Sequence, residues 1–104
     1  MARFVTVLEA HVAHDAVARV AQAYAAELSS PPPEVHESYL VRSLTNPALL
    51  RVINVWVSRE AMQRTETTGR IREEMAVLEA VGARPTLHAY EILGHGVPVI
   101  GPGE

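Results

Sequence analysis

The sequence contains no cysteine and no lysine, and only five of its 104 residues are aromatic. Without cysteine the chain has no disulfide, no thiolate nucleophile and no cysteine-bound metal. All nine basic residues are arginines scattered along the chain, and the net charge is −3. Because a phosphate-binding surface needs a concentrated basic patch, nucleic acid is not an expected partner.

Long apolar runs are also missing. A membrane-spanning helix needs about 20 apolar residues in a row, so neither a span nor a membrane partner is expected. The apolar run near the N-terminus is short and is interrupted by Glu9. That pattern is unlike an export signal, so we expect a cytoplasmic protein. A composition of 48% hydrophobic and 20% charged residues is typical of one soluble globular domain.

The hydrophobic periodicity predicts four strands and two helices in the order β-α-β-β-α-β. This is the order of the ferredoxin-like α+β fold, in which a four-stranded antiparallel sheet carries both helices on one face. The predicted strands span residues 4–12, 35–44, 49–57 and 86–93. We expect the domain to occupy residues 1–94, followed by a Gly/Pro-rich tail at residues 95–104.

The first helix is predicted at residues 16–28, with Asp15 as its N-cap, and it ends before a run of three prolines. The second helix follows Ser58, another N-cap residue, breaks near residues 67–69 and ends at Gly82. The charged residues along its second half are expected to form a solvated face: Glu66, Arg70, Arg72, Glu73 and Glu74.

Helices on one face of the sheet leave its other face bare. The apolar candidates for that face are Val5, Val7, Ile53, Val55 and Val57. An exposed apolar patch of this kind marks an interface, so we expect a homodimer in which two sheets stack face to face. Arg51 on the same face needs a carboxylate partner, either Glu9 or Glu37. The tail segment Val97-Pro98-Val99 either crosses to the partner or frays.

The segment Val55-Trp56-Val57-Ser58-Arg59-Glu60-Ala61 resembles the strand-to-helix signature of the antibiotic biosynthesis monooxygenase family. The family pattern is an apolar strand ending in Val-Trp, a serine-type cap, and a charged helix start with Glu-Ala. The order of elements over residues 3–93 also agrees with this family. The resemblance implies a dimeric α/β barrel with a pocket between the helices and the sheet of each protomer. It also implies oxygenation of a small aromatic ligand without a metal or flavin cofactor.

The chain departs from the family in the helix after this signature. Many members have a histidine nine residues after the tryptophan and often a second one a turn later. The first position is Thr65 here, and residues 66–70 contain no histidine. The haem-degrading branch needs an Asn, a Trp and a His at positions that fall on Leu8, Thr65 and about Met75. Haem degradation by that mechanism is therefore excluded.

The family resemblance places the wall of the pocket on the strand face that carries Trp56. The predicted substrate-binding residues are Phe4, Thr6, Leu8, Tyr24, Tyr39, Val52, Trp56 and Thr65. Trp56 either packs in the core or stacks on a planar ligand. Asn54 is a catalytic candidate on the same strand face. A buried amide needs partners, so it bonds either to neighbouring side chains or to a ligand carbonyl.

The five histidines lack the spacing of metal ligands, and no metal site is expected. His36 and His88 lie in predicted strands and are the best candidates for a catalytic base, because imidazole titrates near neutrality. A strand histidine is also commonly structural, and the hairpin register leaves open which sheet face each occupies. The sequence thus predicts a cofactor-free oxygenase of an anthrone-type or quinol-type aromatic. A cyclase or isomerase, and a non-catalytic ligand-binding protein, stay as alternatives.

Overall fold

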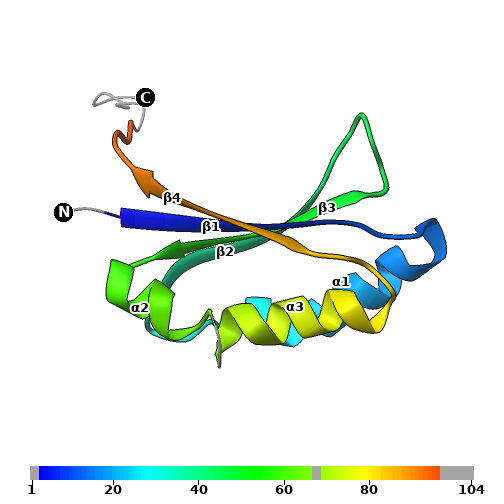
Figure 1. Cartoon of the computed structure of the whole chain (residues 1–104), viewed down its shortest axis with the longest axis horizontal. Helices are drawn as coiled ribbons and strands as arrows, with labels where there is room; N and C mark the ends of the chain where they lie inside the picture. Colours follow the sequence, from blue (N-terminus) through cyan, green and yellow to red (C-terminus); the bar gives the residue numbers. More distant parts are fainter. Residues whose placement is uncertain (1–2, 67–68, 97–104) are drawn as a thin grey trace, which may run out of the picture.

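The computed structural model describes residues 3–66 and 69–96. The elements are β1 (Arg3–His11), the short 3-10 helix η1 (His14–Ala16), α1 (Val17–Ser29), β2 (Val35–Arg42), β3 (Leu49–Trp56), α2 (Arg59–Arg64), α3 (Arg70–Ala80) and β4 (Thr86–Ile92). The strands form one antiparallel sheet in the order β2-β3-β1-β4, and the helices all lie on one side of it (Figure 1). The predicted ferredoxin-like α+β fold is confirmed.

Local signals explain most of the element ends. The Ser58 hydroxyl accepts a hydrogen bond from the Ala61 N–H and caps α2, as predicted. Gly82 follows α3 with φ of +82°, a left-handed conformation that glycine adopts without strain. The prediction for Asp15 was wrong, because this residue lies inside η1 and no side chain caps η1 or α1.

The second predicted helix is two helices, α2 and α3, as the predicted break requires. The end of α2 and the start of α3 approach closely at Gly69. A Cβ atom on Gly69 would lie only 3.0 Å from the Cα of Thr65, so any side chain there would force the end of α2 to shift. The predicted tail falls largely outside the described residues, including all of Val97-Pro98-Val99.

The register of the sheet places one row of side chains across all four strands on the helix side. Thr6 of β1 lies opposite Asn54 of β3 and opposite Ala89 of β4. Asn54 in turn lies opposite Ser38 of β2. We call these four residues the polar row. The rows on both sides of it are largely apolar, with Leu40, Val52, Leu8 and Leu87 in one and Val35, Trp56, Phe4 and Glu91 in the other.

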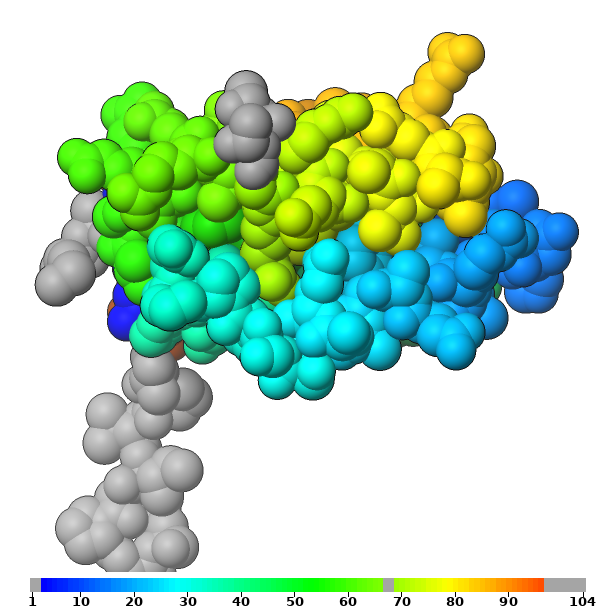
Figure 2. Space-filling view, turned by 90° about the horizontal axis from the view of Figure 1, so that it is seen from below, coloured from blue at the N-terminus to red at the C-terminus, as the bar shows by residue number. Residues whose placement is uncertain are grey.

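The core lies between the sheet and the two longer helices, α1 and α3. These helices lie side by side and cover the sheet (Figure 2). Tyr24 from α1 is fully buried, as its place in the apolar stripe predicts. Trp56 forms a second apolar cluster with Val35, Ala61, Met62 and Ile71. Within the described residues, no helix is both long and apolar enough to cross a membrane.

The side of the sheet without helices, which we call the open face, is mostly apolar at its centre. Val5, Val7, Ile53 and Val55 are only partly buried there. The Arg51 guanidinium lies 3.1 Å from the Glu9 carboxylate at this face. The expectation that Arg51 pairs with Glu9 or Glu37 is therefore confirmed for Glu9.

Candidate functional site

Asn54 is the centre of a buried hydrogen-bond network under α3. Its Nδ2 donates to both carboxylate oxygens of Glu74, at 2.9 and 3.1 Å. Its Oδ1 accepts from Ser38 Oγ at 2.6 Å and from Arg70 Nε at 3.4 Å. One amide N–H is thus shared between the two oxygens of one carboxylate, and the amide oxygen accepts from two donors. Of the two alternatives for Asn54, the structure shows bonding to neighbouring side chains.

Arg70 and Glu74 form a buried ion pair above the polar row. Arg70 Nε lies 3.3 Å from Glu74 Oε2, and the two side chains are only 7% and 2% exposed. The Nη2 atom of Arg70 donates to the backbone oxygen of Glu27 and to Ser38 Oγ. The prediction of a solvated helix face was wrong for both residues. Their i,i+4 spacing puts them on one side of α3, and their contacts with Asn54 and Ser38 show that this side faces the sheet.

Burial raises the pKa of the Glu74 carboxyl to about 7, and the charge of Glu27 adds to this shift. The hydrogen bond from Asn54 and the charge of Arg70 lower the same pKa but offset only part of the effect. Burial also raises the pKa of Tyr24, whose hydroxyl donates to the backbone oxygen of Glu74. Among the described residues, the buried Oε2 of Glu27 has no hydrogen-bond partner, and burial raises the pKa of that carboxyl as well.

Trp56 is fully buried, and its indole N–H donates to Thr6 Oγ1 at 2.9 Å. The structure brings most of the predicted substrate-binding residues together on the helix side of the sheet. Thr6, Leu8, Tyr24, Val52 and Trp56 are each at most 2% exposed and pack as core. The geometry therefore fits the packing alternative for Trp56, and a direct contact of these residues with substrate stays a prediction.

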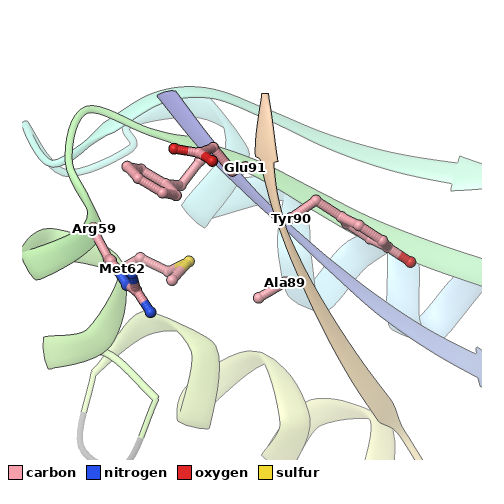
Figure 3. A pocket seen from close by; sticks show the side chains of 6 residues that line it. Arg59, Met62, Ala89, Tyr90 and Glu91 are labelled. Atoms are coloured by element: carbon pink, nitrogen blue, oxygen red, sulfur yellow. The ribbon is translucent and has the colours of Figure 1, made fainter. Parts of the chain in front are cut away.

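A cavity of about 190 Å³ opens at the β4 edge of the sheet, beside α2. We call it the edge cavity. Its lining is Phe4, Arg59, Met62, Ala89, Tyr90 and Glu91. In Figure 3 the Tyr90 ring points away from the other labelled side chains, so its backbone forms the wall. The remaining lining combines apolar groups with one guanidinium and one carboxylate.

The edge cavity adjoins the buried residues just described. Ala89 is the outer end of the polar row, next to Thr6. Phe4 lies opposite both Trp56 and Glu91 in the sheet, and Met62 packs in the Trp56 cluster. Of the predicted substrate-binding residues, Phe4 alone lines this cavity.

The other predicted site residues lie elsewhere. His88 and Tyr39 are on the open face, where the His88 ring stacks on Tyr90 with 6.4 Å between centroids. His36 sits at a register shift in β2 and lines a separate cavity of about 130 Å³. Thr65 ends α2, and its hydroxyl donates to the backbone oxygen of Met62. The structure therefore does not bring His36 or His88 to Asn54.

In residues 3–66 and 69–96, no group of three His, Asp or Glu side chains could hold a metal ion.

Met62, Ala89 and Glu91 are cavity residues that no sequence pattern indicated, and Arg59 was predicted only as part of the Trp56 signature. The position of Arg59 could have been predicted from the sequence, since this residue follows the Ser58 cap and must lie near the end of β3. The positions of Ala89 and Glu91 could not, because their place beside Phe4 depends on how the last strand pairs with the first.

A sheet in the order β2-β3-β1-β4 with its helices on one side defines the ferredoxin-like class of α+β proteins. Within this class the chain is similar to a "putative antibiotic biosynthesis monooxygenase" from Deinococcus radiodurans, with a TM-score of 0.73 and 12% identity. That match covers 94% of this chain and 99% of the other. A protein of the same description from Caulobacter crescentus matches at a TM-score of 0.62 and 18% identity, over 88% of this chain and 91% of the other.

A third solved structure, a "possible oxidoreductase" from Bacteroides thetaiotaomicron, has a TM-score of 0.72 and 12% identity, over 88% of this chain and 98% of the other. No protein-family model matches the sequence, and no curated protein sequence matches it. The predicted resemblance to the antibiotic biosynthesis monooxygenase family is confirmed at the level of the fold.

Proposed function

We propose that this protein is an enzyme that oxygenates a small planar aromatic molecule in the edge cavity. The observation that carries the proposal is the lining of that cavity. Phe4, Met62 and Ala89 offer an apolar surface for a ring, and Glu91 offers a carboxylate beside it. Apolar concave sites with a few convergent polar groups are typical of small-molecule binding. The fold, shared with proteins described as putative monooxygenases, supports the choice of reaction.

In the proposed reaction the substrate itself reduces dioxygen. The Glu91 carboxylate accepts a proton from a phenolic hydroxyl or an activated carbon, which leaves an electron-rich anion. The anion transfers one electron to dioxygen, and the two radicals combine to a peroxide. Protonation and loss of water then convert the attacked carbon to a carbonyl, either the CH₂ of an anthrone or a ring C–H of a phenol, which becomes a quinone. One oxygen atom of dioxygen is in the product and the other is in water.

Oxygen uptake tests this function directly. Purified protein with a panel of quinols and hydroxyanthrones is expected to consume oxygen above the uncatalysed rate and to place one ¹⁸O atom in the product. Glu91→Gln should lower the rate at least about 100-fold, the usual size of a general-base contribution. Glu79→Gln, an exposed carboxylate on α3, should leave the rate unchanged. Absence of uptake with every substrate would overturn the oxygenase proposal.

The same cavity supports the cyclase or isomerase alternative, because Glu91 can act as a general base and the Arg59 guanidinium can stabilise a developing enolate oxygen, and neither role needs dioxygen. Product formed from a suitable carbonyl substrate under nitrogen would identify that class. Tight binding of an aromatic ligand without conversion, in air or under nitrogen, would identify the non-catalytic alternative.

We also propose that two copies of the chain stack through the open face. The apolar centre of this face supports the proposal, since exposed Tyr39, Val41 and Tyr90 extend it toward both edges of the sheet. Ile53→Arg, which puts a charge at that centre, is expected to give a folded monomer in analytical ultracentrifugation. Leu44→Arg, at a side chain that is 98% exposed in the β2–β3 turn, should leave a dimer. A wild-type monomer, or a dimer that survives Ile53→Arg, would contradict the proposal.

A further inference from the structure

The size of the edge cavity limits what it can bind. A closed apolar cavity of about 150 Å³ holds one benzene molecule, and pockets for drug-sized ligands measure about 300–1,000 Å³. At about 190 Å³ the edge cavity has room for one aromatic ring with its substituents, and it is open to solvent on the side of Arg59, Ala89, Tyr90 and Glu91. If one ring of an anthrone filled this space, its two further rings would lie outside the cavity and gain no contact with its lining. Ala89 helps to set the limit, because a longer side chain at this position would project into the cavity (Figure 3).

The charges of the edge cavity limit the chemistry of the ligand. Arg59 comes from α2 and Glu91 from β4, so the two charges approach a bound ring from different elements (Figure 3). In the described part of the chain neither residue takes part in an ion pair within 4 Å, and both side chains are exposed. A guanidinium binds a carboxylate through two parallel hydrogen bonds, whereas a carboxylate accepts from a hydroxyl.

We propose that the edge cavity binds a hydroxylated, single-ring aromatic acid. The ring lies against Phe4 and Met62 over Ala89, the ligand carboxylate binds Arg59, and the ring hydroxyl donates to Glu91. The inference rests on the proposed function, in which Glu91 takes up the proton of that hydroxyl and leaves a phenolate for dioxygen. It narrows the substrate class from quinols and anthrones in general to monocyclic acids.

Calorimetric titration under nitrogen tests the ligand class without turnover. The probes are 3- and 4-hydroxybenzoate, the matching hydroxybenzyl alcohols, which lack the carboxylate, and a dihydroxyanthrone, which has three rings. At least one hydroxybenzoate is expected to bind about 10-fold or more tightly than its alcohol and than the anthrone, as a charge-assisted hydrogen-bond pair implies. Equal binding of acid and alcohol, or tighter binding of the anthrone, would overturn the inference.

Two variants locate the binding site. Arg59→Gln should abolish the preference for acid over alcohol, whereas Arg64→Gln, an exposed residue of the same helix, should preserve it. Ala89→Leu should remove binding of every probe while circular dichroism shows an unchanged fold, because Ala89 is exposed. Ala76→Leu on the exposed side of α3 is its matched control. Unchanged binding by Ala89→Leu would overturn the placement of the site.

Different results would reject the single-ring ligand class and the oxygenase activity. If a hydroxybenzoate binds as expected but no substrate consumes oxygen, the ligand class stands and the oxygenase is rejected. If oxygen uptake with an anthrone persists in Ala89→Leu, the oxygenase stands and the single-ring site is rejected.

Discussion

Replacing Arg70 by alanine is expected to lower the free energy of unfolding by about 3–5 kcal/mol, the usual cost of removing one partner of a buried ion pair. Its partner Glu74 is only 1% exposed and would lose the cation that pairs with it, so this group would have to stay charged in the interior or take up a proton, and both cost free energy. Ser38 Oγ and the backbone oxygen of Glu27 would also lose the donor that Arg70 supplies. Urea denaturation measures the effect.

Arg72 provides a matched control on the same helix. Its guanidinium lies 3.4 Å from the Glu79 carboxylate, but both side chains are close to half exposed. Water screens such a pair, so Arg72→Ala should cost less than about 1 kcal/mol. Equal losses for Arg70→Ala and Arg72→Ala would show that the buried network contributes no more than a surface pair.

The stability of the wild-type protein should fall as the pH rises from about 4.5 to about 7, the interval between the ordinary pKa of a glutamate and that of Glu74. A raised pKa means that the folded chain holds this proton more tightly than the unfolded chain does. The stabilisation that this proton provides is therefore complete below about pH 4.5 and is lost as the pH rises past about 7. Its size is on the order of 3 kcal/mol, because each pKa unit corresponds to about 1.4 kcal/mol.

Glu74→Gln isolates this contribution, because glutamine has nearly the same shape but no titrating group. The groups that face Glu74 are Arg70 on α3, Asn54 on β3, and Tyr24 and Glu27 on α1. Glu27 also has a raised pKa, so Glu27→Gln is the companion variant that separates its smaller contribution in the same direction. Urea midpoints between pH 4.5 and 8 should fall less steeply in Glu74→Gln than in the wild type. Parallel curves for the two proteins would rule out a raised pKa at Glu74.

The sequence was sufficient for features that depend on neighbouring residues. Alternation and helical spacing gave the order of the elements, Ser58 gave the start of α2, and the apolar stripe of α1 gave the burial of Tyr24. Each of these follows from a pattern a few residues long. The pairing of Arg51 with Glu9 was also reachable, since two neighbouring strands with one bare face leave few partners.

The buried ion pair was not predictable in the same way. Opposite charges spaced four residues apart on a helix usually lie on the surface, where they keep their hydration and pay no desolvation free energy. The α3 sequence contains no pattern that distinguishes Arg70 and Glu74 from the exposed charges around them. The edge cavity depends on the pairing of β1 with β4, across most of the chain. The same dependence left the faces of His36 and His88 open until the register was known.

The pairing of β1 also has a consequence for how the chain is made. Of the four strands β1 is synthesised first, yet it lies in the middle of the sheet, where Phe4 pairs with Trp56 of β3 on one side and with Glu91 of β4 on the other. At about 5–20 residues per second, a nascent chain carries β1 for several seconds before β4 leaves the ribosome. Until β3 emerges, both edges of this apolar strand are available to other chains, and the edge that pairs with β4 stays available until the end of the interval. Chaperone binding to the emerging N-terminal segment would therefore matter most for this protein before its last strand appears.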